Sequence, residues 1–179
     1  MHSVYEIQYR IVHPTTTTAA TTTATRYDPT IESLHHKTIR FRKIHFATDI
    51  VDTAGMDEYS RLSRNASLGV HGYALVFSIV SRQSFERIID LNETLLSTLG
   101  DAPDVPRVLV GSMKDLSEQQ RQVTTEEAQR LADKWKVPYV ECSSKTGESV
   151  ADVFHVLLKE IERDEGLLTE TGDGGCAIL

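Results

Sequence analysis

The chain has 179 residues, of which 40% are hydrophobic and 25% charged, and this composition fits one globular domain with tails. Its formal net charge of −7, without a basic cluster, argues against a DNA or RNA partner. Two cysteines are too few for a disulfide framework, and no apolar run reaches the roughly 18 residues of a membrane-spanning helix, so we expect a cytoplasmic protein.

The first 26 residues form an atypical N-terminal segment. Residues 4–12 alternate apolar and polar side chains, which predicts a half-exposed strand. Because a central parallel strand is usually apolar on both faces, this strand is a poor candidate for the first strand of such a sheet, although it could pair along an edge. Residues 15–25 are rich in threonine and lack charge, which is typical of a linker.

The next part of the chain predicts three strands and a helix. Apolar residues alternate between positions 37 and 51, which indicates two strands with a turn near Arg42. Residues 73–80 are almost entirely apolar and predict a strand that is covered on both faces. A helix is expected to begin after Ser81, a good N-cap, and to end at Gly100.

The remainder of the chain continues to alternate strands and helices. Strands are predicted at residues 106–111 and 138–142, and a helix follows each of them. Thr124 and Glu127 form a capping box at the start of the first helix, and an apolar stripe over residues 150–161 marks the second. Repeated crossovers of this kind predict an α/β fold with a mostly parallel sheet and helices on both faces.

Three polar residues come directly after predicted strands: Asp52, Ser112 and Ser143. The carboxyl ends of parallel strands meet at one edge of a sheet, and ligands of doubly wound proteins bind there. We therefore expect these three residues to lie along the same edge.

Five motifs follow one another along the chain: YDPTIE at Tyr27–Glu32, DTAGMDEYS at Asp52–Ser60, VGSMKDL at Val110–Leu116, ECSSKTG at Glu141–Gly147 and CAIL at Cys176–Leu179. Together they resemble the Ras superfamily of small GTPases. The segment GYALVFSIVSRQSFE, which begins at Gly72, is similar to the Rheb and Rap branches, and DEYS favours Rheb. The resemblance implies a Ras-like P-loop NTPase fold, with a GTPase-like domain over residues 27–163 and a flexible tail over residues 164–179.

The resemblance also implies a site for GTP or GDP with Mg²⁺. Thr30 would offer its hydroxyl to Mg²⁺ and its backbone N–H to the γ-phosphate, and Asp52 would hold the same cation. Gly55 would donate its backbone N–H to the γ-phosphate. Each motif alone also fits an ordinary turn, but the joint order of the motifs does not.

The guanine-binding part of the site would come from the later motifs. Asp115 would accept hydrogen bonds from the ring and exocyclic nitrogens of guanine, a pattern that adenine cannot supply. Ser143, Ser144 and Lys145 would lie along the other edge and face of the base. Ser112-Met113 stands where the family has Asn-Lys, and neither side chain reproduces the hydrogen bonds of its counterpart, so we expect weaker binding.

The phosphate-binding loop of the family has no counterpart in the sequence. A G-x-x-x-x-G-K-[ST] loop needs glycines and a lysine, whereas Gly55 is the first glycine and the threonine-rich tract contains no lysine. We therefore expect the first strand, this loop and the first helix to be missing, and GTP, GDP and Mg²⁺ to bind weakly. Met56 stands at the position of the water-orienting glutamine, so intrinsic GTP hydrolysis should be slow.

Two hypotheses about function remain open. One is a Rheb/Ras-type signalling switch whose N-terminal coding segment is replaced or mispredicted, and the other is a non-catalytic pseudo-GTPase that acts as a protein-interaction module. The resemblance implies an effector protein at residues 27–32 and 52–64, a GTPase-activating protein and an exchange factor. The effector would belong to growth signalling through the TOR kinase complex for a Rheb-like member, or to adhesion and polarity for a Rap-like one.

The last four residues form a C-a-a-X box in which the final leucine favours geranylgeranyl transfer to Cys176 by a prenyltransferase. The alternative is a chance cysteine near a flexible end. Residues 164–175 contain no lysine or arginine and several carboxylates, so a single lipid would lack a second membrane signal within the tail. We expect reversible attachment to the cytosolic surface of internal membranes rather than to the plasma membrane.

Overall fold

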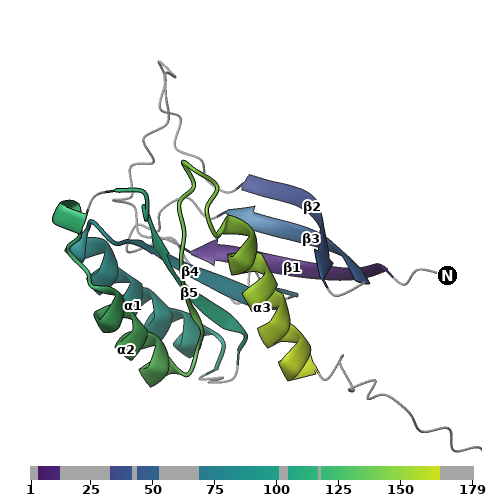
Figure 1. Ribbon diagram of the computed structural model, residues 1–179. Coiled ribbons are helices and arrows are strands. Elements are labelled where there is room, and N and C mark those ends of the chain that lie inside the picture. The colour runs from purple at the N-terminus through teal and green to yellow at the C-terminus, as the bar shows by residue number, and fades with distance from the viewer. Residues whose placement is uncertain are drawn as a thin grey trace, which may run out of the picture.

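A computed structural model describes residues 4–12, 33–41, 44–52, 69–100, 105–116 and 118–165 (Figure 1). The elements in chain order are β1 (Val4–Val12), β2 (Ser33–Phe41), β3 (Ile44–Asp52), β4 (Gly72–Ser78), α1 (Arg82–Thr98), β5 (Arg107–Ser112), the 3₁₀ turn η2 (Glu118–Gln120), α2 (Thr125–Trp135), β6 (Tyr139–Glu141) and α3 (Val150–Glu165). None of these helices is long and apolar enough to cross a membrane.

The strands form one six-stranded sheet in the order β2-β3-β1-β4-β5-β6. All neighbouring strands run parallel except β2, which is antiparallel to β3. Helices α1 and α2 lie on one face of the sheet and α3 lies on the other (Figure 1). The expected α/β architecture with a mostly parallel sheet and helices on both faces is confirmed.

Strand β1 differs from the expectation, because it lies in the middle of the sheet and pairs with both β3 and β4. The predictions of an edge position and of a missing first strand are therefore wrong. In register, Tyr5 is opposite Phe46 and Tyr9 is opposite Ile50. The β3 side chains that face α3 are buried, whereas the alternate positions of β3 are only half-buried. An alternating pattern is thus compatible with a central position here, and pairing on both sides satisfies more backbone groups than an edge would.

Strand β4 is buried on both faces, and its side chains alternate between two buried clusters. On the α1–α2 face, the ring of Phe77 meets Phe85 edge to face, with centroids 4.9 Å apart. On the other face, Leu157 and Ile161 of α3 are fully buried. A Cβ at Gly72 would lie 2.9 Å from Ile161 Cδ1, so glycine lets α3 approach β4 closely.

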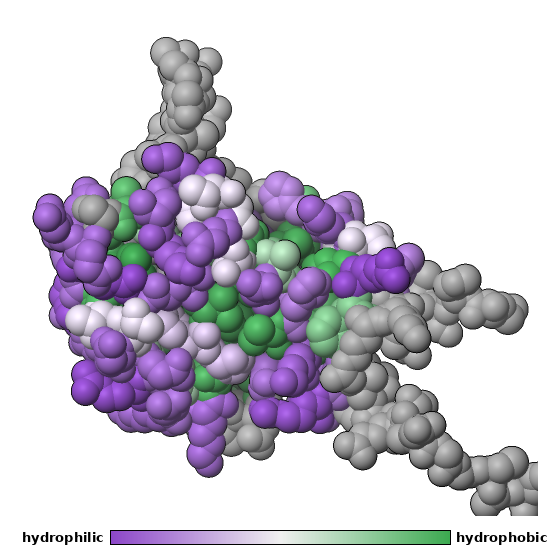
Figure 2. Space-filling model, viewed as in Figure 1, coloured by the Kyte–Doolittle hydropathy of each residue, from purple (hydrophilic) through white to green (hydrophobic). Residues whose placement is uncertain are grey.

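The helix boundaries follow the predicted caps. The Ser81 hydroxyl accepts a hydrogen bond from the Ser84 backbone N–H, and the Thr124 hydroxyl accepts one from the Glu127 N–H at 3.2 Å. Helix α2 is followed by its C-cap Lys136, which adopts a left-handed conformation with φ 56° and closes the last turn through its backbone N–H. Figure 2 shows mainly hydrophilic side chains on the described surface in this view, with hydrophobic ones between them near the centre.

Candidate functional site

The loops after β5 and β6 lie side by side at the carboxyl edge of the sheet. The backbone N–H of Lys114 donates to the Cys142 carbonyl at 3.1 Å, which joins the two loops. The Lys114 ammonium also lies 2.6 Å from the Glu148 carboxylate, and this hydrogen bond raises the pKa of Lys114. Asp52 ends β3, which is parallel to the central strands, at the same edge. The expected common edge for Asp52, Ser112 and Ser143 is present.

The carboxylate of Asp115 is held by two neighbours at this edge. Its Oδ1 accepts a hydrogen bond from the Ser143 hydroxyl at 2.6 Å, and its Oδ2 lies 3.8 Å from Lys145 Nζ. The hydrogen bond from Ser143, assisted by the charge of Lys145, lowers the pKa of Asp115 despite partial desolvation. The carboxylate is therefore ionised at neutral pH, and its orientation is set by Ser143.

Ser143 is itself held by the turn that follows β6. It is fully buried, and its hydroxyl accepts a hydrogen bond from the Thr146 N–H at 3.2 Å while it donates to Asp115. The Ser143 carbonyl accepts from the Gly147 N–H at 2.9 Å, and Gly147 has a φ of 79°, which a glycine adopts without strain. Ser144 and Lys145 are exposed beside this turn, so both side chains are accessible to a ligand from solvent.

The side chains of Ser112 and Met113 are turned back onto β4. The Ser112 hydroxyl donates to the Phe77 carbonyl at 2.8 Å. Met113 has a φ of 69°, and its sulfur accepts a contact at 3.2 Å from the hydroxyl of Ser78, which is buried. The two residues that differ from the family's Asn-Lys therefore use the Ser112 hydroxyl and the Met113 sulfur for contacts within the domain.

A polar network under the β6 loop was missed by the sequence analysis. Arg121 makes a paired contact with Glu141, with Nη1 to Oε1 at 3.0 Å and Nη2 to Oε2 at 2.9 Å. Thr125 and Tyr139 donate to the same Oε1 at 2.9 and 2.8 Å. Burial acts to raise the pKa of Glu141, but the hydrogen bonds outweigh burial and lower it. A glutamate at the end of a short strand was the only signal in the sequence.

Four of the expected site residues, Thr30, Gly55, Met56 and Cys176, lie outside the described residues. The described site residues are Asp52 and those that would contact the guanine base. The half of the expected site that would contact the phosphates includes positions that the structure does not describe.

The fold and this edge define the class of Ras-like α/β proteins: five parallel strands, one antiparallel neighbour, and two polar loops after the last two strands. Residues 16–163 match the family model described as Ras family. The chain belongs to the Ras family.

Similar proteins narrow the assignment to the Rheb branch. The chain is 44% identical over 153 residues to "GTP-binding protein Rheb homolog" of Dictyostelium discoideum, covering 86% of this chain and 82% of that protein. It is 44% identical over 153 residues to "GTP-binding protein rhb1" of Schizosaccharomyces pombe, covering 85% and 81%. Human "GTP-binding protein Rheb" is 36% identical over 153 residues, covering 86% and 82%. The resemblance to a Rheb-type small GTPase is confirmed.

Proposed function

We propose that this Rheb-type protein recognises guanine nucleotides through Asp115 and holds them weakly. The observation that carries the proposal is the oriented carboxylate, in which the Thr146 N–H, the Ser143 hydroxyl and Asp115 form a continuous chain of hydrogen bonds. Ras-family GTPases bind GTP or GDP with Mg²⁺, and these ligands are the ones that the site would take.

The chemistry of Asp115 fits guanine rather than adenine. Guanine presents two adjacent donors, the N1–H and the exocyclic amino group, and an ionised carboxylate accepts both. Adenine presents an acceptor at N1 and would face the carboxylate with a lone pair. The buried Ser143 hydroxyl fixes the carboxylate before the base arrives, which reduces the entropy lost on binding.

Weak binding follows from two features. Ser112 and Met113 contact β4 through Phe77 and Ser78, so their side chains do not offer the hydrogen bonds of an asparagine and a lysine to the ligand. The sequence also lacks the glycine-rich phosphate loop, and the loss of about five phosphate contacts at roughly 1.5 kcal/mol each would weaken binding by something near 10⁵-fold. The chain purified from cells should carry little GDP or GTP.

Turnover of GTP should also be slow, because Met56 cannot orient water in place of glutamine. An activating protein that supplies its own polar side chain could restore hydrolysis. The effector would bind at residues 27–32 and 52–64, and an exchange factor would load the nucleotide.

The base-recognition proposal is tested with the Asp115→Asn variant. An amide offers one acceptor and one donor, which matches the N1–H and the 2-oxo group of xanthine. The variant should lose affinity for fluorescent GDP at least tenfold and gain affinity for the xanthine analogue. Asp152→Asn, an exposed change of equal charge on α3, is the matched control and should bind both nucleotides as the parent does. Unchanged preference in Asp115→Asn would contradict the role of Asp115.

A non-catalytic interaction module is the second candidate function, and the contact of Met113 with Ser78 favours it. In that case an effector would bind the chain equally well with and without added nucleotide and Mg²⁺. Calorimetric titration of the effector under both conditions separates the two functions, since a switch requires differential affinity for its two states.

We also propose that Cys176 carries a geranylgeranyl group that attaches the chain reversibly to internal membranes. Support comes from the terminal C-a-a-X sequence and from the absence of basic residues in positions 164–175. A tagged parent chain should be partly on internal membranes, whereas Cys176→Ser should be diffuse. The same diffuse distribution for both would remove the lipid assignment.

A further inference from the structure

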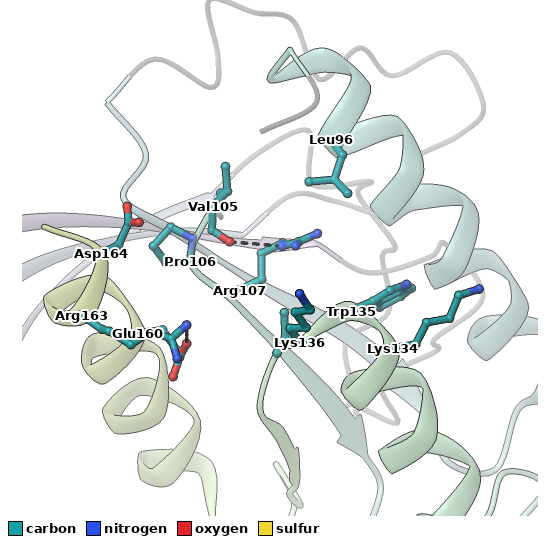
Figure 3. A pocket seen from close by; sticks show the side chains of 11 residues that line it. Leu96, Val105, Pro106, Arg107, Lys134, Trp135, Lys136, Glu160, Arg163 and Asp164 are labelled. Carbon is teal, nitrogen blue, oxygen red and sulfur yellow. Dashed lines mark hydrogen bonds and ion pairs between the residues drawn. The ribbon is translucent and has the colours of Figure 1, made fainter. Parts of the chain in front are cut away.

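A groove of about 670 Å³ lies at the end of the sheet opposite the Asp115 edge. Its walls come from the segment before β5, the ends of α1 and α2, and the end of α3 (Figure 3). Strand β5 separates the two ends and would span about 20 Å over its six residues. A ligand in this groove would therefore leave the guanine-binding edge accessible.

The groove is cationic in a chain whose net charge is −7. Four of its lining side chains are basic and two are acidic: Arg107, Lys134, Lys136 and Arg163 against Glu160 and Asp164. Arg163 Nη2 lies 2.6 Å from Glu160 Oε2, which offsets one charge of each sign. Neither Lys134 nor Lys136 forms an ion pair within the part of the chain that the structure describes.

The positions of these cations are set by the fold. Arg107 is only 3% exposed at the floor of the groove, where Nη1 donates to Asn92 Oδ1 at 2.6 Å and Nε donates to the Val105 carbonyl at 3.2 Å. Lys136 is placed by the left-handed turn that ends α2. Both cationic groups add to the positive potential at the groove.

Apolar groups stand beside the cations. Trp135 is half-buried in the wall, and Leu96, Val105 and Pro106 also line the groove (Figure 3). Tryptophan with nearby lysine and arginine suits the boundary between an apolar phase and water. The lining therefore matches a ligand that has both a multiply charged anionic part and an apolar part.

We propose that this groove binds the phosphate-bearing headgroup of an anionic membrane lipid. Arg163 and Asp164 belong to the last turns of α3, and the chain reaches Cys176 from there over at most about 40 Å. An anchor at Cys176 would hold this end of the domain near the bilayer. The groove then supplies the second membrane signal that the tail lacks. Its placement near the bilayer rests on the proposed lipidation of Cys176.

The test uses the full chain without its lipid, so that it does not depend on prenylation or on nucleotide. Trp135 is the only tryptophan, and its fluorescence reports on the groove directly. The chain is titrated with phosphatidylcholine vesicles that contain phosphatidylinositol 4,5-bisphosphate, and binding is measured by the emission of Trp135 and by co-sedimentation. Soluble inositol 1,4,5-trisphosphate and a poly-glutamate peptide are titrated separately.

Two matched variants locate the binding surface. Lys134→Gln combined with Arg163→Gln removes two charges from the groove, whereas Arg130→Gln combined with Lys159→Gln removes two exposed charges of the same helices that do not line it. Each basic side chain near an anionic surface contributes about 5-fold in affinity, so the groove pair should bind about 25-fold more weakly. The control pair should bind as the parent does, and circular dichroism checks that both variants fold.

The outcomes separate this proposal from its competitors. Saturable vesicle binding with a change in Trp135 emission, lost only in the groove pair, supports it. Equal weakening by both pairs would show that diffuse surface charge is responsible. Equally tight binding of soluble inositol trisphosphate would assign the groove to a free phosphate, and equally tight binding of poly-glutamate would assign it to an acidic protein segment. Any of these three results, or no binding, overturns the proposal while leaving the tests of Asp115 and Cys176 unaffected.

Discussion

The described strands at the two ends of the sheet differ in how far they are buried. Strands β4 and β5 are buried along nearly their whole length between α1, α2 and α3. The described side chains of β2 are mostly exposed, and Leu34 is 54% exposed. Side-chain packing therefore stabilises the half that carries Asp115 and Ser143. In the other half, β3 buries Phe46 and Ile50 on the side of α3, but the described side chains of β2 are mostly exposed, so changes of those exposed side chains should have small effects.

The largest expected effect concerns apolar packing. Leu157→Ala empties a fully buried position between α3 and β4, and should lower the free energy of unfolding by about 2–5 kcal/mol. Leu34→Ala removes the same atoms from an exposed strand and should change the free energy by less than about 0.5 kcal/mol. Urea unfolding followed by circular dichroism measures both. Similar losses in the two variants would remove the distinction between the halves.

Ion pairs give the next largest contrast. Glu141→Gln leaves Arg121 with a reduced counter-charge at a site where the two side chains are 12% and 11% exposed, and should cost about 3 kcal/mol. Asp49→Asn breaks the 2.5 Å contact with His36, whose side chain is 73% exposed, and should cost less than about 1 kcal/mol. The thermal midpoint of each variant is the measurement. A larger loss from Asp49→Asn would mean that the half with β2 and β3 depends more on polar contacts than its exposure indicates.

The smallest effect is a pH dependence specific to the Asp115 edge. The Ser143 hydroxyl holds the pKa of Asp115 below its usual value, so the ionised form stabilises the folded state. This contribution is present above the pKa of the unfolded chain, about 3.9, and is lost as the pH falls through the lower folded value. Stability of the parent should therefore fall more steeply below about pH 4 than that of Asp115→Asn.

The control for this pH profile is Asp133→Asn, which removes an exposed carboxylate from α2. Urea midpoints measured from about pH 5 down to about pH 2 should give parallel curves for Asp133→Asn and the parent. If Asp115→Asn also ran parallel to the parent, the hydrogen bond from Ser143 would not favour the ionised form of Asp115.

Much of the fold could be predicted from local features of the sequence. The N-cap residues Ser81 and Thr124 mark the helix starts, and the apolar run over residues 73–80 corresponds to β4. Caps and hydrophobic period are properties of neighbouring residues, so a sequence carries them directly. The convergence of Ser112 and Ser143 also followed, because parallel strands place their carboxyl ends at one edge.

Other features could not be predicted because they depend on contacts between distant residues. The alternation in β1 was interpreted as that of an edge strand. Its neighbour β3 is well buried on only one face, so an alternating pattern is compatible with this part of the sheet, and the sequence does not show this. The Arg121–Glu141 pair joins the segment before α2 to the end of β6, and no local pattern couples these positions.

The sequence by itself determined the order of strands and helices along the chain, the family resemblance and the positions that depart from the family pattern. Only the tertiary structure decided that residues 4–12 lie at the centre of the sheet, that Ser143 holds Asp115, and that Met113 contacts Ser78. It also decided that Arg107, Lys134 and Arg163 share one groove. The reason is physical: element type follows from residues within a few turns of one another, whereas a site needs groups that only the folding of the whole chain brings within hydrogen-bond or Coulomb range.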